Sequence, residues 1–156
     1  MPADQVPQFR TYRHARCQQE TIVAGQSFEV VSNPMSSMER TFCTPCGAMF
    51  PIEEFAWVDS GETISDYYAR HSASATPLQR TLCSKSFMVA LIAVAAVATS
   101  IGTSTLVANN DLFTRIMIAA GGFLIGAFIG MAIFLSGFAN PIKRQVCGVE
   151  DTRRLT

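Results

Sequence analysis

The fold is decided by the stretch FMVALIAVAAVATSIGTSTLVA-NND-LFTRIMIAAGGFLIGAFIGMAIFLSGFA, residues 87–139. A helix needs roughly 20 apolar residues to cross the hydrocarbon core of a bilayer. Residues 87–108 supply 22 without a formal charge, and residues 112–139 supply 28 with Arg115 as the only charge. The link of three polar residues between them is long enough only for a tight turn. The stretch therefore predicts two transmembrane helices in an antiparallel hairpin.

Positive charges on either side of this stretch predict its orientation. Lysine and arginine concentrate on the cytoplasmic side of membrane proteins, and here they flank the hairpin at Arg80, Lys85, Lys143, Arg144, Arg153 and Arg154. Both termini are therefore expected in the cytoplasm. The first 30 residues contain no apolar run typical of a signal peptide. The small size of the chain and this charge pattern lead us to expect a two-pass protein of a bacterial inner membrane.

The residues before the hairpin carry more acid than base. Residues 1–83 contain six arginines, no lysine and nine acidic residues, which argues against nucleic-acid binding. No nucleophile or pocket pattern accompanies the acidic residues, so we expect no catalytic residues, no enzyme activity and no small-molecule substrate. The acidic side chains are interpreted as a solvated face; they are Glu53, Glu54, Asp59, Glu62 and Asp66.

Two pairs of metal-binding residue types give the sharpest chemical signal. His14 and Cys17 are separated by two residues, as are Cys43 and Cys46. Zinc prefers four tetrahedral nitrogen or sulfur ligands, and each such spacing brings two ligands to one ion. The cytoplasm is reducing, which favours metal binding over disulfides. We predict a structural zinc ion bound by these four residues, with His71 as the alternative to His14.

The second pair carries a family resemblance. The sequence Cys43-Thr44-Pro45-Cys46-Gly47 resembles the metal knuckle of zinc ribbons and rubredoxins, and the resemblance covers residues 14–50. Gly47 suits a turn that needs a positive φ. A ribbon more often has cysteine where this chain has His14, and the histidine disfavours the iron of rubredoxin. The resemblance implies a small, β-rich, zinc-ribbon-like domain.

A redox dithiol is the rival interpretation of Cys43 and Cys46, because C-x-P-C also occurs in thioredoxin-like proteins. Such chemistry uses a helix amino terminus to lower the pKa of the first thiol. Gly47 and Pro51 follow the motif at once and disfavour a long helix there. A membrane-bound thiol–disulfide or electron-transfer protein stays open as the alternative function.

The expected fold class is α+β: a two-helix transmembrane hairpin preceded by a small cytoplasmic zinc-ribbon-like domain. So small a domain has a marginal core and needs a metal or a partner. The boundaries are a flexible N-terminus at 1–9, the domain at 10–75, a linker at 76–85, transmembrane helices at 86–108 and 112–139, and a basic cytoplasmic tail at 140–156.

Local patterns fill in the soluble part. Residues 26–31 have strand composition, with residues 21–24 as a hairpin partner, and residues 40–42 read as extended. A short helix is predicted over residues 63–71, with Thr63 or Ser65 as its cap. The aromatic residues are expected to form the core around the metal; they are Phe55, Trp57, Tyr67 and Tyr68.

The second span repeats glycine every four residues, at Gly122, Gly126 and Gly130. Small residues at this spacing let another helix approach closely. That helix is either the first span or one from another subunit. Cys83 and Cys147 flank the hairpin, where palmitoylation or pairing is possible, but plain thiols are the simpler expectation. Because neither span carries a buried charge, a channel is the least supported function.

Together these features favour a membrane-anchored zinc-binding structural or interaction protein. Its expected partners are membrane lipids and either copies of itself, packed through the glycine faces, or a larger membrane complex in which it is a small accessory subunit.

Overall fold

The computed structural model describes residues 6–155 and divides the chain into two compact units. One combines Met1–Thr76 with Lys143–Thr156, and we call it the terminal unit; the other, Pro77–Ile142, is the hairpin unit. Residues 1–5 of the predicted flexible N-terminus lie outside the described residues.

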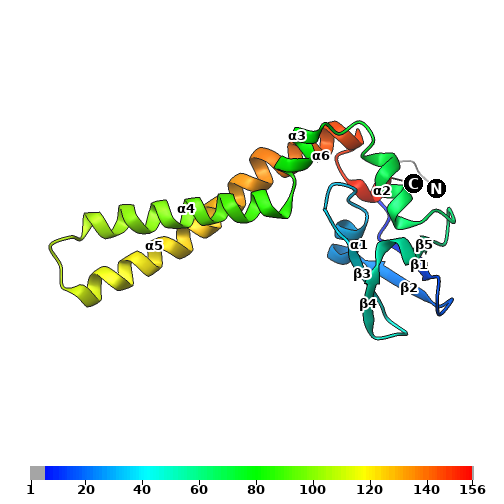
Figure 1. Cartoon of the computed structure of the whole chain (residues 1–156), viewed down its shortest axis with the longest axis horizontal. Helices are drawn as coiled ribbons and strands as arrows, with labels where there is room; N and C mark the ends of the chain where they lie inside the picture. Colours follow the sequence, from blue (N-terminus) through cyan, green and yellow to red (C-terminus); the bar gives the residue numbers. More distant parts are fainter. Residues whose placement is uncertain (1–5, 156) are drawn as a thin grey trace. The chain divides into compact units, whose positions relative to one another are not determined.

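Two small antiparallel sheets form the framework of the terminal unit (Figure 1). The first has the strand order β2-β1-β5, and the second pairs β3 with β4. The strands are β1 (Phe9–His14), β2 (Glu20–Ala24), β3 (Arg40–Cys43), β4 (Ala48–Pro51) and β5 (Phe55–Trp57). Along β1 the buried side chains alternate with exposed or partly exposed ones, as expected for a strand with one face on the core. The extended structure predicted at residues 40–42 is confirmed by β3.

Helices cover these sheets. They are α1 (Gly25–Val31), the 3₁₀ turn η1 (Ile52–Glu54), α2 (Ile64–His71) and the 3₁₀ turn η3 (Thr152–Arg154). The helix predicted over residues 63–71 is confirmed: the Thr63 hydroxyl accepts a hydrogen bond from the Asp66 amide at 3.0 Å, so Thr63 is the cap.

The strand predicted over residues 26–31 is wrong, because this segment is helix α1. Its buried residues, Phe28 and Val31, are three positions apart and so share one helical face on the core. Gly25, at φ +55°, turns the chain directly after β2. The predicted partner strand exists as β2, but it pairs with β1. A run of six apolar and polar residues fits both the two-residue period of a strand and the 3.6-residue period of a helix. Burial of Phe28 and Val31 on one face favours the helix.

The predicted aromatic core is confirmed. Phe55, Trp57 and Tyr67 are fully buried, and Tyr68 nearly so. Phe55 and Trp57 meet Tyr12 of β1 edge to face, with ring centroids 5.1 and 6.1 Å from that of Tyr12, and Tyr67 meets Trp57 in the same way. Such pairs are favourable beyond the area they bury.

The segment predicted to be a basic tail is structured. It forms helix α6 (Asn140–Cys147) and the turn η3. Thr152 is fully buried, and its hydroxyl lies 3.4 Å from that of Ser32. The buried Arg10 guanidinium donates to the Leu155 carbonyl at 3.4 Å while its other nitrogens bind Asp59 at 2.9 and 3.0 Å. The chain on both sides of the hairpin therefore belongs to one unit.

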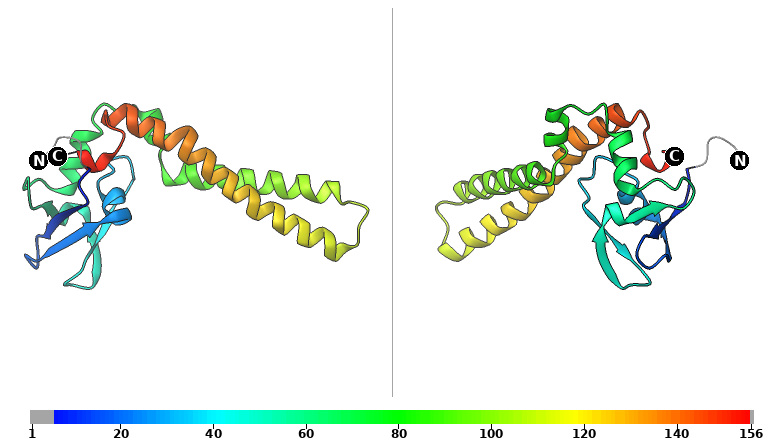
Figure 2. Two further views of the ribbon diagram at one scale, coloured as in Figure 1. Left: turned by 180° about the vertical axis from the view of Figure 1, so that it is seen from behind. Right: turned by 45° about the vertical axis from the view of Figure 1, so that its right-hand side comes forward.

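The hairpin unit holds two long helices that pack antiparallel (Figures 1 and 2). They are α4 (Lys85–Leu106) and α5 (Leu112–Ile133), preceded by the short α3 (Pro77–Leu82). The Asp111 carboxylate caps α5 by accepting from the Thr114 amide at 3.0 Å. Both α4 and the helix that begins with α5 are long and apolar enough to cross a membrane.

The sequence predicts that the second transmembrane helix ends at residue 139, but the helix continues beyond it. It passes through a π-helical segment, Phe134–Ala139, directly into α6. Proline lacks an amide hydrogen and crowds the carbonyl four residues earlier. The wider π turn changes the hydrogen-bond pattern just before Pro141, which is how a helix absorbs such a residue without ending.

The glycines predicted to pack helices face α4 of the same chain. Gly122, Gly126 and Gly130 are the buried residues of α5. A Cβ at Gly126 would lie 2.5 Å from the Ala95 carbonyl oxygen. At this close approach the Thr99 hydroxyl donates to the Gly122 carbonyl at 2.8 Å. The sequence left open whether these glycines pack against the first span or against another subunit. In the structure they pack against the first span, so this face is not free to pack another subunit.

Candidate metal centre

The four residues predicted to bind zinc lie on two hairpins. His14 is the last residue of β1 and Cys17 lies in the turn to β2; Cys43 is the last residue of β3 and Cys46 lies in the turn to β4. Each hairpin thus presents one residue from a strand end and one from the following turn. This is the geometry that the x-x spacing of a metal knuckle requires.

The two turns share their backbone geometry. The Gln18 amide donates to the His14 carbonyl at 2.9 Å, and the Gly47 amide donates to the Cys43 carbonyl at the same distance. Gln18 has φ +57° and Gly47 has φ +64°. The residue after each second ligand is therefore in the left-handed region, which glycine adopts without strain and glutamine does not.

The donor atoms of His14, Cys17, Cys43 and Cys46 all lie within 4.8 Å of one another, so the group could hold a metal ion such as zinc. Cys17 Sγ lies 3.7 Å from Cys43 Sγ, and His14 Nδ1 lies 3.3 Å from Cys17 Sγ and 3.7 Å from Cys46 Sγ. In a tetrahedral zinc site with normal bond lengths, two sulfurs are about 3.8 Å apart and a sulfur and a nitrogen about 3.5 Å. These three separations match the edges of that tetrahedron.

His14 is held in the orientation that a ligand needs. Its Nδ1 faces the sulfurs, while its Nε2 lies 3.2 Å from Glu54 Oε2. The imidazole is almost fully buried, between the rings of Phe50 and Phe55 at 4.4 and 4.8 Å between centroids. A carboxylate that accepts the second ring N–H fixes the tautomer and strengthens the first nitrogen as a ligand. Arg16 in turn pairs with Glu54 at 2.7 Å.

The acid–base properties of the cluster favour a cation. A hydrogen bond from the Gln19 backbone lowers the pKa of Cys17 to about 7, with further help from the neighbouring thiols and His14. The thiol of Cys46, hydrogen-bonded to the sulfurs of Cys17 and Cys43, has its pKa raised to about 12. One thiolate is thus stabilised, but a second beside it is not. Neighbouring thiolates repel one another. A divalent cation among the sulfurs offsets this repulsion and lets all of the thiols ionise.

The residues around the Glu54 carboxylate also shift its pKa. Desolvation raises its pKa, but the hydrogen bonds from His14 and Arg16 outweigh this effect and hold the pKa below its usual value. The group is therefore ionised wherever the cluster can bind metal, so it accepts from His14 Nε2–H as a charged carboxylate.

Every donor in the cluster comes from the protein, so a tetrahedral ion would have no open position for water or substrate. Such closed sites are structural, whereas catalytic zinc keeps a position free. His71, the alternative ligand, lies on α2 outside the cluster, with its ring 4.6 Å from that of Tyr67. The helix that a thioredoxin-type dithiol uses is also missing at this motif, because Cys46 lies in the turn between β3 and β4.

Comparison with protein families, curated proteins and solved structures gives no match for this chain. The resemblance to zinc-ribbon knuckles therefore rests on the residues of the two hairpins alone.

Sequence reasoning missed Glu54 and Phe50 as neighbours of His14. Glu54 is 40 residues from His14, and no spacing rule connects them. The strand pairing brings them together, since β1 pairs with β5 at His14 and Phe55. The only sequence signal is that Glu54 directly precedes the aromatic segment Phe55–Trp57.

We predict that Glu54→Gln weakens zinc binding roughly tenfold, because the amide accepts from His14 Nε2–H without carrying the charge that strengthens Nδ1. Competition with a chromophoric chelator measures the change. Glu53→Gln, at the exposed neighbouring carboxylate, is the matched control and should leave the affinity unchanged. Equal affinities for both variants would contradict the role given to Glu54.

We also predict that Gln18→Gly stabilises the terminal unit by about 1 kcal/mol, because it removes the left-handed strain of a residue with a side chain. Gly47→Ala, at the equivalent position of the other turn, should destabilise it by a similar amount, although no atom lies within 4 Å of the new Cβ. Denaturant unfolding followed by Trp57 fluorescence tests both. A loss of stability in Gln18→Gly would show that its side chain contributes more than its backbone costs.

Proposed function

We propose that the chain is a membrane-anchored protein whose terminal unit is held together by a structural zinc ion and acts as an interaction module. The observation that carries this proposal is the convergence of His14, Cys17, Cys43 and Cys46 at tetrahedral spacing. A closed site of this kind supplies folding free energy and no reactive position, so the role that follows is binding and not catalysis.

The membrane anchor is supported by what the long helices expose. Only 6% of the most apolar 18-residue segment of α4 is buried, and only 22% of the corresponding segment of the helix that begins with α5. A core helix of a water-soluble protein would be mostly buried. Here Val94, Leu124 and Phe128 are more than 60% exposed and would lie against lipid.

The topology of the anchor follows from the terminal unit. Because residues 6–76 and 143–155 belong to one unit, the chain must return to the side of the membrane from which it entered. An antiparallel hairpin does this with two crossings. The lysines and arginines next to its ends favour the cytoplasmic side for the terminal unit.

The partner of the module is a further part of the proposal. The glycine face of α5 is covered by α4, so assembly with copies of this chain or with a larger membrane complex would use other surfaces. An accessory role in such a complex fits a small unit that has a closed metal site and an exposed apolar surface.

Elemental analysis of the detergent-purified full chain tests the proposal. We expect one zinc per chain, lost in Cys43→Ser and kept in Cys147→Ser, whose thiol lies outside the cluster. Absence of metal together with reversible disulfide formation between Cys43 and Cys46 would overturn it and support a thiol–disulfide protein.

Resistance to extraction by alkaline carbonate tests the anchor. The chain should stay with the membrane pellet, whereas a chain with residues 86–139 replaced by a short flexible linker should be released. Release of the intact chain would contradict membrane insertion.

A further inference from the structure

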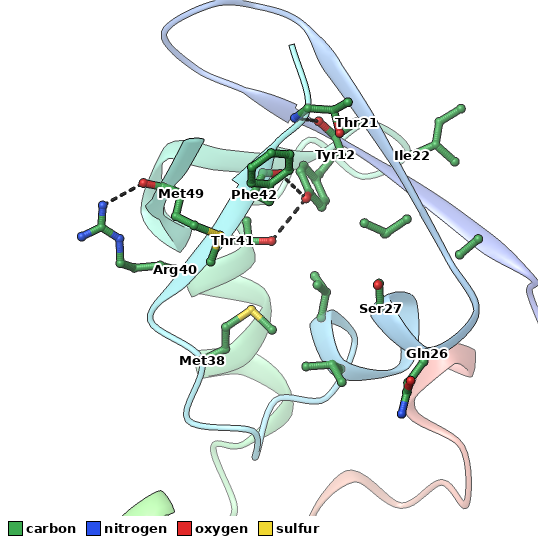
Figure 3. A pocket seen from close by; sticks show the side chains of 15 residues that line it. Tyr12, Thr21, Ile22, Gln26, Ser27, Met38, Arg40, Thr41, Phe42 and Met49 are labelled. Carbon is green, nitrogen blue, oxygen red and sulfur yellow. Dashed lines mark hydrogen bonds between the residues drawn. The ribbon is translucent and has the colours of Figure 1, made fainter. Parts of the chain in front are cut away.

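A groove of about 540 Å³ lies on the terminal unit between β2, β3 and α1, and none of the four metal ligands lines it. Figure 3 shows Met38, Phe42 and Met49 on the side of the second sheet, with Gln26 and Ser27 of α1 across from them. Tyr12 Oη, which donates to the Phe42 carbonyl at 2.6 Å, ties the two sides together. None of the features that support the zinc site requires this groove.

One wall of the groove is an unpaired strand edge. β2 is the outer strand of its sheet, because the order is β2-β1-β5. The His14 amide donates to the Gln19 carbonyl, and the Gly25 amide donates to the Gln8 carbonyl. These two bonds identify which residue pairs of β1 and β2 are hydrogen-bonded to each other. In an antiparallel ladder the residues that face the neighbour alternate. Thr21 and Val23 thus turn their backbone groups to β1, and Ile22 turns its amide and carbonyl outward.

The opposite wall has the same property. The Ile52 amide donates to the Glu39 carbonyl, so Glu39, Thr41 and Cys43 are the residues that face β4. Phe42 turns its backbone away from β4, which agrees with the hydrogen bond that its carbonyl accepts from Tyr12 Oη. The groove is therefore bordered by backbone edges of two sheets, and the described residues offer the backbone of Ile22 no hydrogen-bond partner.

Apolar side chains are exposed around these edges. Ile22, Val30, Phe42 and Met49 all line the groove, and each is between 44% and 68% exposed. Arg40 is the only charged residue among the fifteen that line it, and its guanidinium donates to the Met49 carbonyl at 2.7 Å. An occupant that matches this lining is uncharged and apolar, with backbone donors and acceptors along one side.

We propose that the groove binds an extended, uncharged segment of a partner protein, which adds to β2 as a fourth strand of the first sheet. Hydrogen bonds to Ile22 hold the segment, and its alternate side chains pack against Val30, Phe42 and Met49. A lipid chain or small apolar molecule would fill the volume but leave the Ile22 backbone unpaired. Strand addition satisfies both the edge and the apolar lining, and it is a recurrent mode of peptide recognition.

The test selects octapeptides from a random displayed library against the zinc-loaded full chain in mild detergent. We expect selected peptides to lack charge, to alternate apolar residues, and to compete for one site. Bound as synthetic peptides, they should slow hydrogen exchange of the Ile22 amide, and this readout needs no variant. Selection of charged peptides, or protection elsewhere with Ile22 unchanged, would overturn the proposal.

Two variants give the matched comparison. Ile22→Pro removes the outward amide hydrogen, and its ring also fixes φ and replaces the exposed side chain, so it should weaken binding of the selected peptides at least tenfold. Ile22→Val changes the side chain but keeps the amide, and it should bind within twofold of the parent. Zinc content checks that both fold. If Ile22→Pro fails to fold, Val30→Glu places a charge on the exposed face of α1 and should weaken binding similarly. Unchanged binding in the folded variants, or failure of the library to yield any peptide that competes for the groove, would contradict strand addition.

Discussion

Chelation of the metal is expected to unfold the terminal unit and leave the two long helices folded. The apparent binding free energy of structural zinc is roughly 10–16 kcal/mol at neutral pH. This is as large as the whole stability of a typical domain, about 5–15 kcal/mol. The ligands also connect the two sheets of the unit, since His14 and Cys17 come from one hairpin and Cys43 and Cys46 from the other. Without an ion, the fully buried Cys43 and nearly buried His14 lose the interaction that joins these sheets.

Trp57 makes this outcome measurable. It is the only tryptophan of the chain and is fully buried in the terminal unit, so its emission should move to the red on chelation. Far-ultraviolet circular dichroism should keep most of its helical signal, because α4 and α5 do not contribute ligands. Restoring zinc should reverse the shift of the emission.

Cys43→Ser should reproduce the effect of chelation without a chelator, and Cys147→Ser is its matched control because that thiol is partly buried in the same unit. A Trp57 spectrum that stays blue after complete removal of metal would show that the aromatic core is stable alone. The zinc site would then be a binding site on a fold that is stable without metal, and zinc would not be needed for folding.

The metal cluster was predictable because each pair of ligands is local. Two residues between His14 and Cys17, and two between Cys43 and Cys46, allow only a turn that brings the pair together, and zinc chemistry joins the pairs. The hairpin was predictable for a similar reason: hydropathy over a stretch of 20 residues is a strong signal and the link is too short for other arrangements. What these predictions share is that sequence neighbours decide them.

The missed features depend on residues far apart in the chain. The segment Gly25–Val31 is helical because Phe28 and Val31 find the core together, which its composition does not reveal. Thr152 packs on Ser32 across 120 residues, so a segment with the composition of a tail becomes part of the unit. Likewise, Glu54 reaches His14 only through pairing of β1 with β5. Local pattern carries no information about such contacts.

Gly126→Ala is expected to separate the two long helices over the middle of their length. A Cβ there would collide with the Thr99 hydroxyl and would lie 2.5 Å from the Ala95 carbonyl and 2.7 Å from the Ala96 Cα. Two of these neighbours are backbone, so α4 must move as a whole. Overpacking typically costs about 1–3 kcal/mol, and displacement also breaks the bond from Thr99 to the Gly122 carbonyl. We expect a loss near the upper end of that range.

Gly121→Ala is the matched control, because no atom lies within 4 Å of its new Cβ although it is the same substitution in the same helix. Spin labels attached through p-acetylphenylalanine at the exposed positions Val89 and Met131 avoid the native cysteines and report the helix separation. In SDS titrations from mixed micelles, Gly126→Ala should separate the labels at a lower SDS fraction than the parent, and Gly121→Ala should follow the parent. If Gly121→Ala were the more disruptive change, α5 would pack through its other face, and Gly122, Gly126 and Gly130 would be free to meet another subunit.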